Sequence, residues 1–151
     1  MISVRPAVLA DAEAMSDLLI ASITALCVED HQNRAEAVVL WLANKTPAGV
    51  RSWFANPEGR LFVAEHDGVI AAAGGINAKR EIVLNYVSPE HRFVGASSAL
   101  LAAMEAALGP GEARLSSTVT AHRFYLSRGW TDAGAIEPYA GMIAYPMRKL
   151  L

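Results

Sequence analysis

The chain has 151 residues, the size of one ordinary domain, of which 53% are hydrophobic and 19% charged. This composition can build a hydrophobic core and excludes the polar, charge-rich class of disordered proteins. The 13 Lys and Arg residues against 15 Asp and Glu residues give a net charge of −2, so nothing predicts electrostatic capture of nucleic acid.

The N-terminal part of the chain shows mainly helical periodicity. A short strand is expected at residues 2–5, and a first helix follows Asp11, whose side-chain oxygen can cap it. The apolar face of this helix recurs at helical spacing and consists of Met15, Leu18, Leu19, Ser22, Ile23 and Leu26. Residues 27–34 are polar and predict a loop. Further helices are expected at 35–42 and after Thr46-Pro47, where proline takes the first helical position.

From residue 61 onward the hydrophobic period becomes that of strands. Residues 61–66 and 69–77 are separated by Asp67-Gly68, a two-residue turn that suits a hairpin. Gly74-Gly75 in the second strand indicates a bulge or the close approach of another backbone. Residues 81–87 are apolar at nearly every position, which is typical of a central strand covered on both faces.

The last third of the chain alternates helices and strands. Helices are expected at residues 97–108 and 121–128, with a short strand at 114–117 between them. Of the last two strands, one is expected from Trp130 onward and the other at residues 142–147. This order predicts one domain, residues 1–151, of the mixed α/β class, with a central mixed sheet and helices on both faces.

The turn at residues 92–97, Arg-Phe-Val-Gly-Ala-Ser, lies between the buried strand and a helix. The first N–H groups of a helix lack internal partners, and the helix dipole favours negative charge there. Gly95 lets the backbone approach a ligand, and Arg92 can add a guanidinium at the same anion. The turn therefore suits a diphosphate, although an ordinary strand-to-helix turn would also need a glycine. It is neither a Walker A loop nor a Rossmann fingerprint.

Residues Val87–Leu101 resemble the acyl-CoA-binding motif of the GNAT superfamily of N-acetyltransferases: Val-x-Pro, then Arg-x-x-Gly-x-small, then a helix that opens with paired leucines. A second segment, Ala121–Trp130, is similar to the family's Ala-x-x-Phe-Tyr-x-x-x-Gly-Phe motif. The chain departs from the family pattern at Ser97, at Phe93, which replaces a frequent glycine, and at Thr118, which replaces a frequent asparagine. The resemblance implies a GNAT fold with a largely antiparallel sheet of six to seven strands.

The resemblance also implies a ligand, acetyl-CoA, lying where the central strand and the next one splay apart. The backbone of two central-strand residues would pair with the pantetheine arm, and the N–H groups after Arg92 would hold the diphosphate. The predicted cofactor-binding residues are Tyr86, Val87, Arg92, Phe93, Val94, Gly95, Ala96, Ser97, Ser98 and Thr118. No metal site is predicted.

Transfer to an amine requires that two protons be managed. An amine of pKa about 10.4 is mostly protonated at neutral pH, and freeing its lone pair costs roughly 4–5 kcal/mol unless a base helps. Glu81 stands where the histone-acetylating branch of the superfamily has its catalytic glutamate, and strand alternation puts it on one face with Asn85. A solvated carboxylate at a strand end, with ordered water as the base, is the alternative.

Tyr125 is the predicted general acid, because the superfamily often places a tyrosine at this position and a phenol can protonate the thiolate of CoA. The alternative is a half-buried aromatic whose hydroxyl satisfies a backbone group. The acidic cluster at Glu29 and Asp30, with the adjacent His31, borders the acceptor pocket by the same resemblance. It would attract a cationic amine, or it is surface charge without a role.

Together these residues predict an acetyl-CoA-dependent N-acetyltransferase. It would act on a primary amine of a small molecule, or of a peptide or protein, by direct attack in a ternary complex. A non-catalytic acyl-CoA-binding sensor or regulatory module is the alternative. No nucleic acid or membrane partner is expected, and the last strands are compatible with a homodimer. Because Cys27 is the single cysteine and neither a signal peptide nor a membrane-spanning run is visible, we expect a cytoplasmic protein.

Overall fold

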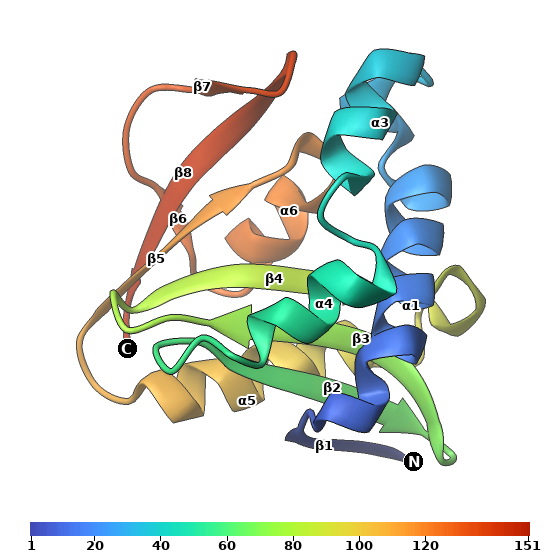
Figure 1. The fold of residues 1–151 in the computed structure, drawn as a ribbon. Helices are drawn as coiled ribbons and strands as arrows, with labels where there is room; N and C mark the ends of the chain where they lie inside the picture. Colours follow the sequence, from blue (N-terminus) through green and yellow to red (C-terminus); the bar gives the residue numbers. More distant parts are fainter.

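An eight-stranded sheet runs through the computed structural model, which describes residues 1–151 (Figure 1). The strands are β1 (Ile2–Pro6), β2 (Arg60–His66), β3 (Val69–Ile76), β4 (Glu81–Val87), β5 (Glu112–Ser117), β6 (Thr131–Asp132), β7 (Glu137–Tyr139) and β8 (Met142–Leu150). Their order is β1-β2-β3-β4-β5-β8-β6, and β7 pairs with the other end of β8. Only β4 and β5 pair in parallel. The predicted mixed, largely antiparallel sheet is confirmed.

The sheet has eight strands where six or seven were expected. The additional strand is β7, three residues long, which pairs with β8 at Pro138↔Ile143 and its neighbours. Proline cannot donate a hydrogen bond to a ladder, so the sequence around it carries no strand pattern. Strand β7 exists because β8 is long enough to pair with β6 near its end and with β7 near its start.

Helices cover both faces of the sheet, as predicted (Figure 1). They are α1 (Ala12–Leu26), α2 (Val28–His31), α3 (Ala35–Leu42), α4 (Pro47–Trp53), α5 (Ala96–Leu108) and α6 (Val119–Ser127), with 3-10 turns η1 (Leu9–Asp11) and η2 (Pro89–His91). One core cluster lies between the sheet and α1 and α4, and a larger one lies between the sheet and α5 and α6. None of these helices is long and apolar enough to cross a membrane.

Helix α5 packs unusually close to the sheet at Gly74. A Cβ atom on Gly74 would lie 2.8 Å from the Sδ atom of Met104 and 3.1 Å from a methyl carbon of Leu100. A larger side chain would require the ends of the Met104 and Leu100 side chains to move, since core atoms are already in contact. Gly74 therefore marks a close approach of α5 through its side chains, and the pairing of β3 with β4 shifts register next to Gly75, where the sequence had offered a bulge as the other alternative.

The polarity of residues 27–34 predicted a loop, but this segment contains the short helix α2. His31 is fully buried because both ring nitrogens are satisfied: Nε2 donates to the Ile23 carbonyl at 2.9 Å, and Nδ1 accepts from the Asn33 N–H at 3.0 Å. The ring thus has a backbone partner on each side. Polar residues can be buried where every polar atom finds a partner, which composition alone does not reveal.

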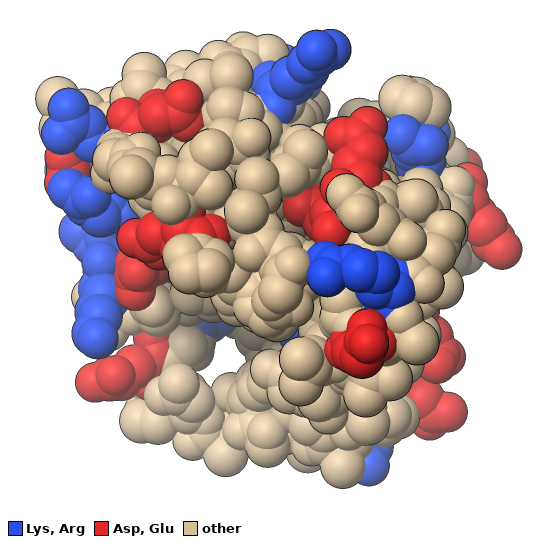
Figure 2. Space-filling model, turned by 90° about the horizontal axis from the view of Figure 1, so that it is seen from above, with Lys and Arg blue, Asp and Glu red and all other residues tan.

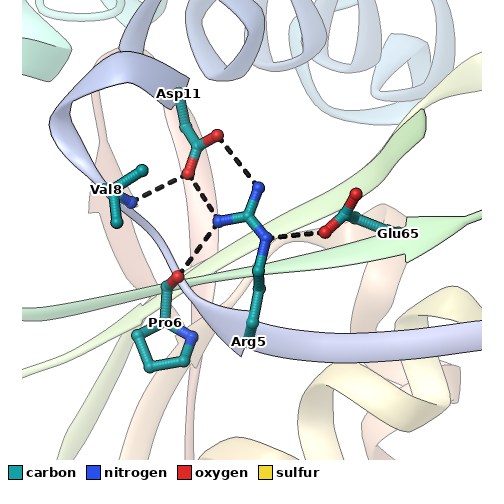
Figure 3. A network of polar contacts seen from close by, with 5 residues as sticks. All are labelled: Arg5, Pro6, Val8, Asp11 and Glu65. Carbon is teal, nitrogen blue, oxygen red and sulfur yellow. Dashed lines mark hydrogen bonds and ion pairs between the residues drawn. The ribbon is translucent and has the colours of Figure 1, made fainter. Parts of the chain in front are cut away.

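Asp11 was expected to cap α1, but its side chain makes no capping hydrogen bond to that helix. It holds Arg5 instead (Figure 3). The Nη1 and Nη2 atoms of Arg5 donate to the two carboxylate oxygens of Asp11 at 2.8 and 3.0 Å, and its Nε donates to Glu65 at 2.6 Å. Asp11 also accepts from the Val8 N–H at 2.8 Å. These bonds, first that of Arg5, hold the pKa of Asp11 below its ordinary value. The network joins β1, β2 and the start of α1.

Candidate functional site

Strands β4 and β5 separate after only two paired positions, Glu81↔Arg114 and Ile82↔Leu115. The separation begins at a bulge in β4. Along β3, Gly75 pairs with Leu84 and the next residue, Ile76, pairs with Ile82, so Val83 has no partner. A bulge bends its strand and re-aims the side chains that follow. The sheet therefore opens between β4 and β5 toward their C-terminal ends.

A cavity of about 570 Å³ lies in this opening. Nine of the ten predicted cofactor-binding residues line it: Tyr86, Val87, Arg92, Phe93, Gly95, Ala96, Ser97, Ser98 and Thr118. Val94 does not line it and is partly exposed. The surface of the molecule is visibly hollowed when seen from above, and uncharged side chains form most of the rim of the hollow (Figure 2).

The turn before α5 leaves its N–H groups free. Gly95 adopts the left-handed conformation, with φ +91°, and no side chain caps the helix. No turn hydrogen bond uses the N–H groups of residues 93–98. Unpartnered N–H groups at a helix start suit an anion.

Phe93 explains why a glycine is frequent at its position. Its φ is +65°, in the left-handed region where a side chain costs about 1–2 kcal/mol. The ring is 92% exposed, and the Arg92 guanidinium lies 4.7 Å from its centroid. A glycine would adopt this φ without that cost.

Arg128 lines the same cavity, although the sequence pattern predicted only the end of a helix at this position. Its guanidinium donates to the Ser98 hydroxyl at 2.5 Å and lies 5.3 Å from the ring centroid of Phe124. Together with His91 and Arg92 it gives the cavity a basic lining. Its place three residues after Tyr125, within the second motif, was the one signal in the sequence.

Tyr125 lies on α6, with 6% of its surface exposed, and lines the cavity. Its hydroxyl accepts a hydrogen bond from the Asn85 side-chain N–H at 3.1 Å, so its own proton remains free to donate. Burial raises the pKa of Tyr125 to about 12, although the bond from Asn85 opposes the rise. The hydroxyl therefore stays protonated at neutral pH.

A second cavity, of about 250 Å³, lies on the other side of β4, and Glu81 lines this one rather than the first. Asn77 positions Glu81: its Nδ2 donates to the Glu81 carboxylate at 2.9 Å, and its Oδ1 accepts from the Glu81 N–H at 3.1 Å. Seven residues line both cavities: Ile82, Val83, Tyr86, Leu115, Ser116, Ser117 and Thr118. The separated parts of β4 and β5 thus form a wall between them.

The expectation that Glu81 and Asn85 share a face is wrong, because the bulge at Val83 intervenes. Simple alternation would put Ile82 and Leu84 on one face, yet Ile82 packs in the core on the α5 side and Leu84 in the core on the α1 side. Asn85 consequently reaches α6, and Glu81 faces the cavity below α3.

Asp30 is a buried carboxylate that fastens α2 to α6 rather than a surface charge. It accepts from the Val119 N–H at 2.7 Å, and from the Thr120 N–H and hydroxyl at 3.2 and 2.5 Å. Thr118 caps the same helix, since its hydroxyl oxygen accepts from the Ala121 N–H at 3.0 Å. The start of the helix that carries Tyr125 is therefore held from two sides.

Residues 23–151 match the sequence model of the acetyltransferase (GNAT) domain. The chain belongs to the GNAT acetyltransferase family. No curated protein sequence matches it significantly.

Several solved GNAT structures share the fold. A GCN5-related N-acetyltransferase from Rhodopseudomonas palustris is 21% identical, with a TM-score of 0.86 over 99% of this chain and 95% of that chain. The PaiA N-acetyltransferase from Thermoplasma acidophilum, solved with coenzyme A, is 17% identical, with a TM-score of 0.80 over 100% and 99%. YncA from Salmonella typhimurium, solved with its cofactor acetyl-CoA, is 18% identical, with a TM-score of 0.66 over 99% and 94%.

Proposed function

We propose that this GNAT protein transfers an acetyl group from acetyl-CoA to a primary amine of a small molecule, or of a peptide or protein. The observation that carries the proposal is the Tyr125 hydroxyl, which is buried in the larger cavity, accepts from Asn85 and keeps its own proton free. Complexes of PaiA with coenzyme A and of YncA with acetyl-CoA support the choice of ligand.

The residues around the larger cavity suit each part of acetyl-CoA. The free N–H groups at the start of α5 would bind the diphosphate, assisted by the guanidinium groups of Arg92 and Arg128. Beyond Ile82, β4 has no strand partner on its β5 side. An unpaired strand edge can accept an extended ligand through main-chain hydrogen bonds, and the pantetheine arm is such a ligand.

The reaction would proceed by direct attack. The amine nitrogen forms a bond to the thioester carbon, and the bond from carbon to sulfur then breaks. The sulfur takes the proton of Tyr125, which regains one from solvent. The amine nitrogen loses its proton to Glu81 or to a water molecule, so the acid acts from one cavity and the base from the other.

Tyr125 would donate a hydrogen bond to the sulfur before it gives up its proton. Its pKa of about 12 keeps the phenol protonated near neutral pH, so the proton is available when the bond from carbon to sulfur breaks. A donor beside the departing sulfur would also stabilise the negative charge that develops there, which lowers the energy of the transition state.

The variant Tyr125→Phe tests the proposal, with Tyr145→Phe as the matched control, because Tyr145 stacks on His122 outside both cavities. Free thiol is measured with acetyl-CoA and a panel of primary amines, and acetyl-CoA affinity is measured by calorimetry. We expect Tyr125→Phe to lower kcat about 100-fold or more without loss of affinity. Binding without thiol release from any amine by the unaltered protein would overturn the proposal in favour of an acyl-CoA sensor.

A further inference from the structure

The smaller cavity carries an inference about the acceptor, which rests on the proposed function. It lies under α3, β7 and β8, and its wall toward the larger cavity is the separated part of β4 and β5. Its 250 Å³ would hold about eight water molecules at ~30 Å³ each. An amine bound here would have a compact body, with its nitrogen next to the opening between the strands.

The charges that line this cavity have one sign. Glu81 and Asp30 line it, and no Lys, Arg or His does. Both oxygens of Asp30 are occupied by the start of α6, whereas one oxygen of Glu81 accepts from Asn77 and the other has no protein partner. One carboxylate oxygen thus remains for a cationic amine. A ligand carboxylate or phosphate would meet two negative charges and no positive one.

The rest of the lining is largely aromatic and aliphatic. Trp41, Tyr86 and Tyr139 line the cavity beside Met142 and Ile143. The Trp41 Nε1 donates to the Tyr86 hydroxyl at 3.3 Å, so the polar atom of the indole is already satisfied. These groups can bury an apolar body, and aromatic faces also attract cations.

We propose that this cavity selects compact primary amines with an apolar, arylalkyl or alkyl body, and rejects amines that carry a carboxylate or phosphate. The basic lining of the larger cavity strengthens the contrast, since His91, Arg92 and Arg128 lie on the coenzyme side only. The protein thus separates the anionic coenzyme from the cationic acceptor by the sign of the charges on either side of β4.

Three acceptors that share one ring and chain test the inference: phenethylamine, phenylalanine and phenylalaninamide. The amide has nearly the shape of the carboxylate without its charge. We expect kcat/KM, measured by thiol release, to be at least about 100-fold higher for phenethylamine than for phenylalanine, with phenylalaninamide close to phenethylamine. Equal rates with phenylalanine, or equal rejection of the amide, would overturn the inference and leave the proposed function standing. Thiol release with no amine at all would instead overturn the proposed function.

A designed charge gives an independent test. Ile143 lines the cavity and is 42% exposed, so Ile143→Arg places a cation there without disturbing the core. We expect this variant to raise the ratio of kcat/KM for phenylalanine to kcat/KM for phenethylamine by about tenfold or more. Ile136→Arg is the matched control, because Ile136 is 52% exposed and lines neither cavity. An unchanged ratio in Ile143→Arg would contradict the charge argument.

Discussion

Asn85 donates to the Tyr125 hydroxyl at 3.1 Å and so joins β4 to α6 across the mouth of the separated strands. The bulge at Val83 lies between Glu81 and Asn85 and puts the two residues on opposite faces, so that Asn85 reaches α6 while Glu81 lines the smaller cavity. The irregularity at which β4 and β5 separate therefore also divides Asn85, which holds the Tyr125 hydroxyl, from Glu81.

Replacing Asn85 tests this relationship. In Asn85→Ala the hydroxyl loses a donor that lowers its pKa, so the pKa of Tyr125 rises further and the ring is held less firmly. We expect kcat to fall about tenfold, the equivalent of about 1.4 kcal/mol, with acetyl-CoA affinity unchanged. Steady-state kinetics measures the first effect and calorimetry the second. A weakened affinity with unchanged kcat would show that Asn85 serves the ligand rather than Tyr125.

Arg128 should contribute to coenzyme binding. We expect Arg128→Gln to weaken acetyl-CoA binding about tenfold, and the loss should shrink at high salt because it is electrostatic. Arg123→Gln is the control, since Arg123 is an exposed residue of the same helix that lines neither cavity. Calorimetry at two salt concentrations measures both variants. Equal losses of affinity in the two variants would show that the net charge of the protein, and not the position of Arg128, is responsible.

Asp30 should act through α6. Removing a carboxylate oxygen in Asp30→Asn leaves part of the first turn of α6 without its acceptor, which should lower the free energy of unfolding by about 2 kcal/mol. Because α6 carries Tyr125, kcat should fall as well. The neighbouring exposed Glu29 provides the control Glu29→Gln. Full activity in a destabilised Asp30→Asn protein would show that Asp30 stabilises the fold without affecting catalysis.

The acid stability of the protein should depend on Asp11. Its pKa is lowered from the ordinary 3.8, so its contribution is present above pH 3.8 and is lost as the pH falls through the folded-state pKa. We expect Asp11→Asn to reduce the free energy of unfolding by about 2 kcal/mol at neutral pH. Denaturant titrations should show this difference shrinking below pH 3.8. A difference that persists at pH 2 would mean that packing, not charge, is responsible.

Sequence patterns predicted those parts of the fold that local chemistry determines. The hairpin at Asp67-Gly68, the helix that starts at Gly95 and the close approach at Gly74 each have a short-range cause. The position of Tyr125 beside the larger cavity followed from the family resemblance. These features need only neighbouring residues, or a motif, to be read.

The remaining features depend on contacts between distant segments. The bulge lies opposite Gly75, but its extra residue, Val83, is on β4, in an apolar run without glycine or proline. Nothing in that run marked the extra residue, so the faces of Glu81 and Asn85 were assigned wrongly. Asp30 is buried because α6, 90 residues later in the chain, supplies its donors. Arg128 joins the cavity through Ser98, 30 residues earlier.

The most direct test of acetyl transfer is a product balance. The protein is mixed with acetyl-CoA and a panel of primary amines that includes phenethylamine, and free thiol and N-acetylated amine are quantified by mass spectrometry. We predict equal amounts of the two products for at least one amine, in a reaction that Tyr125→Phe slows. Bound acetyl-CoA that stays intact with every amine, or thiol released without any amide, would contradict the account.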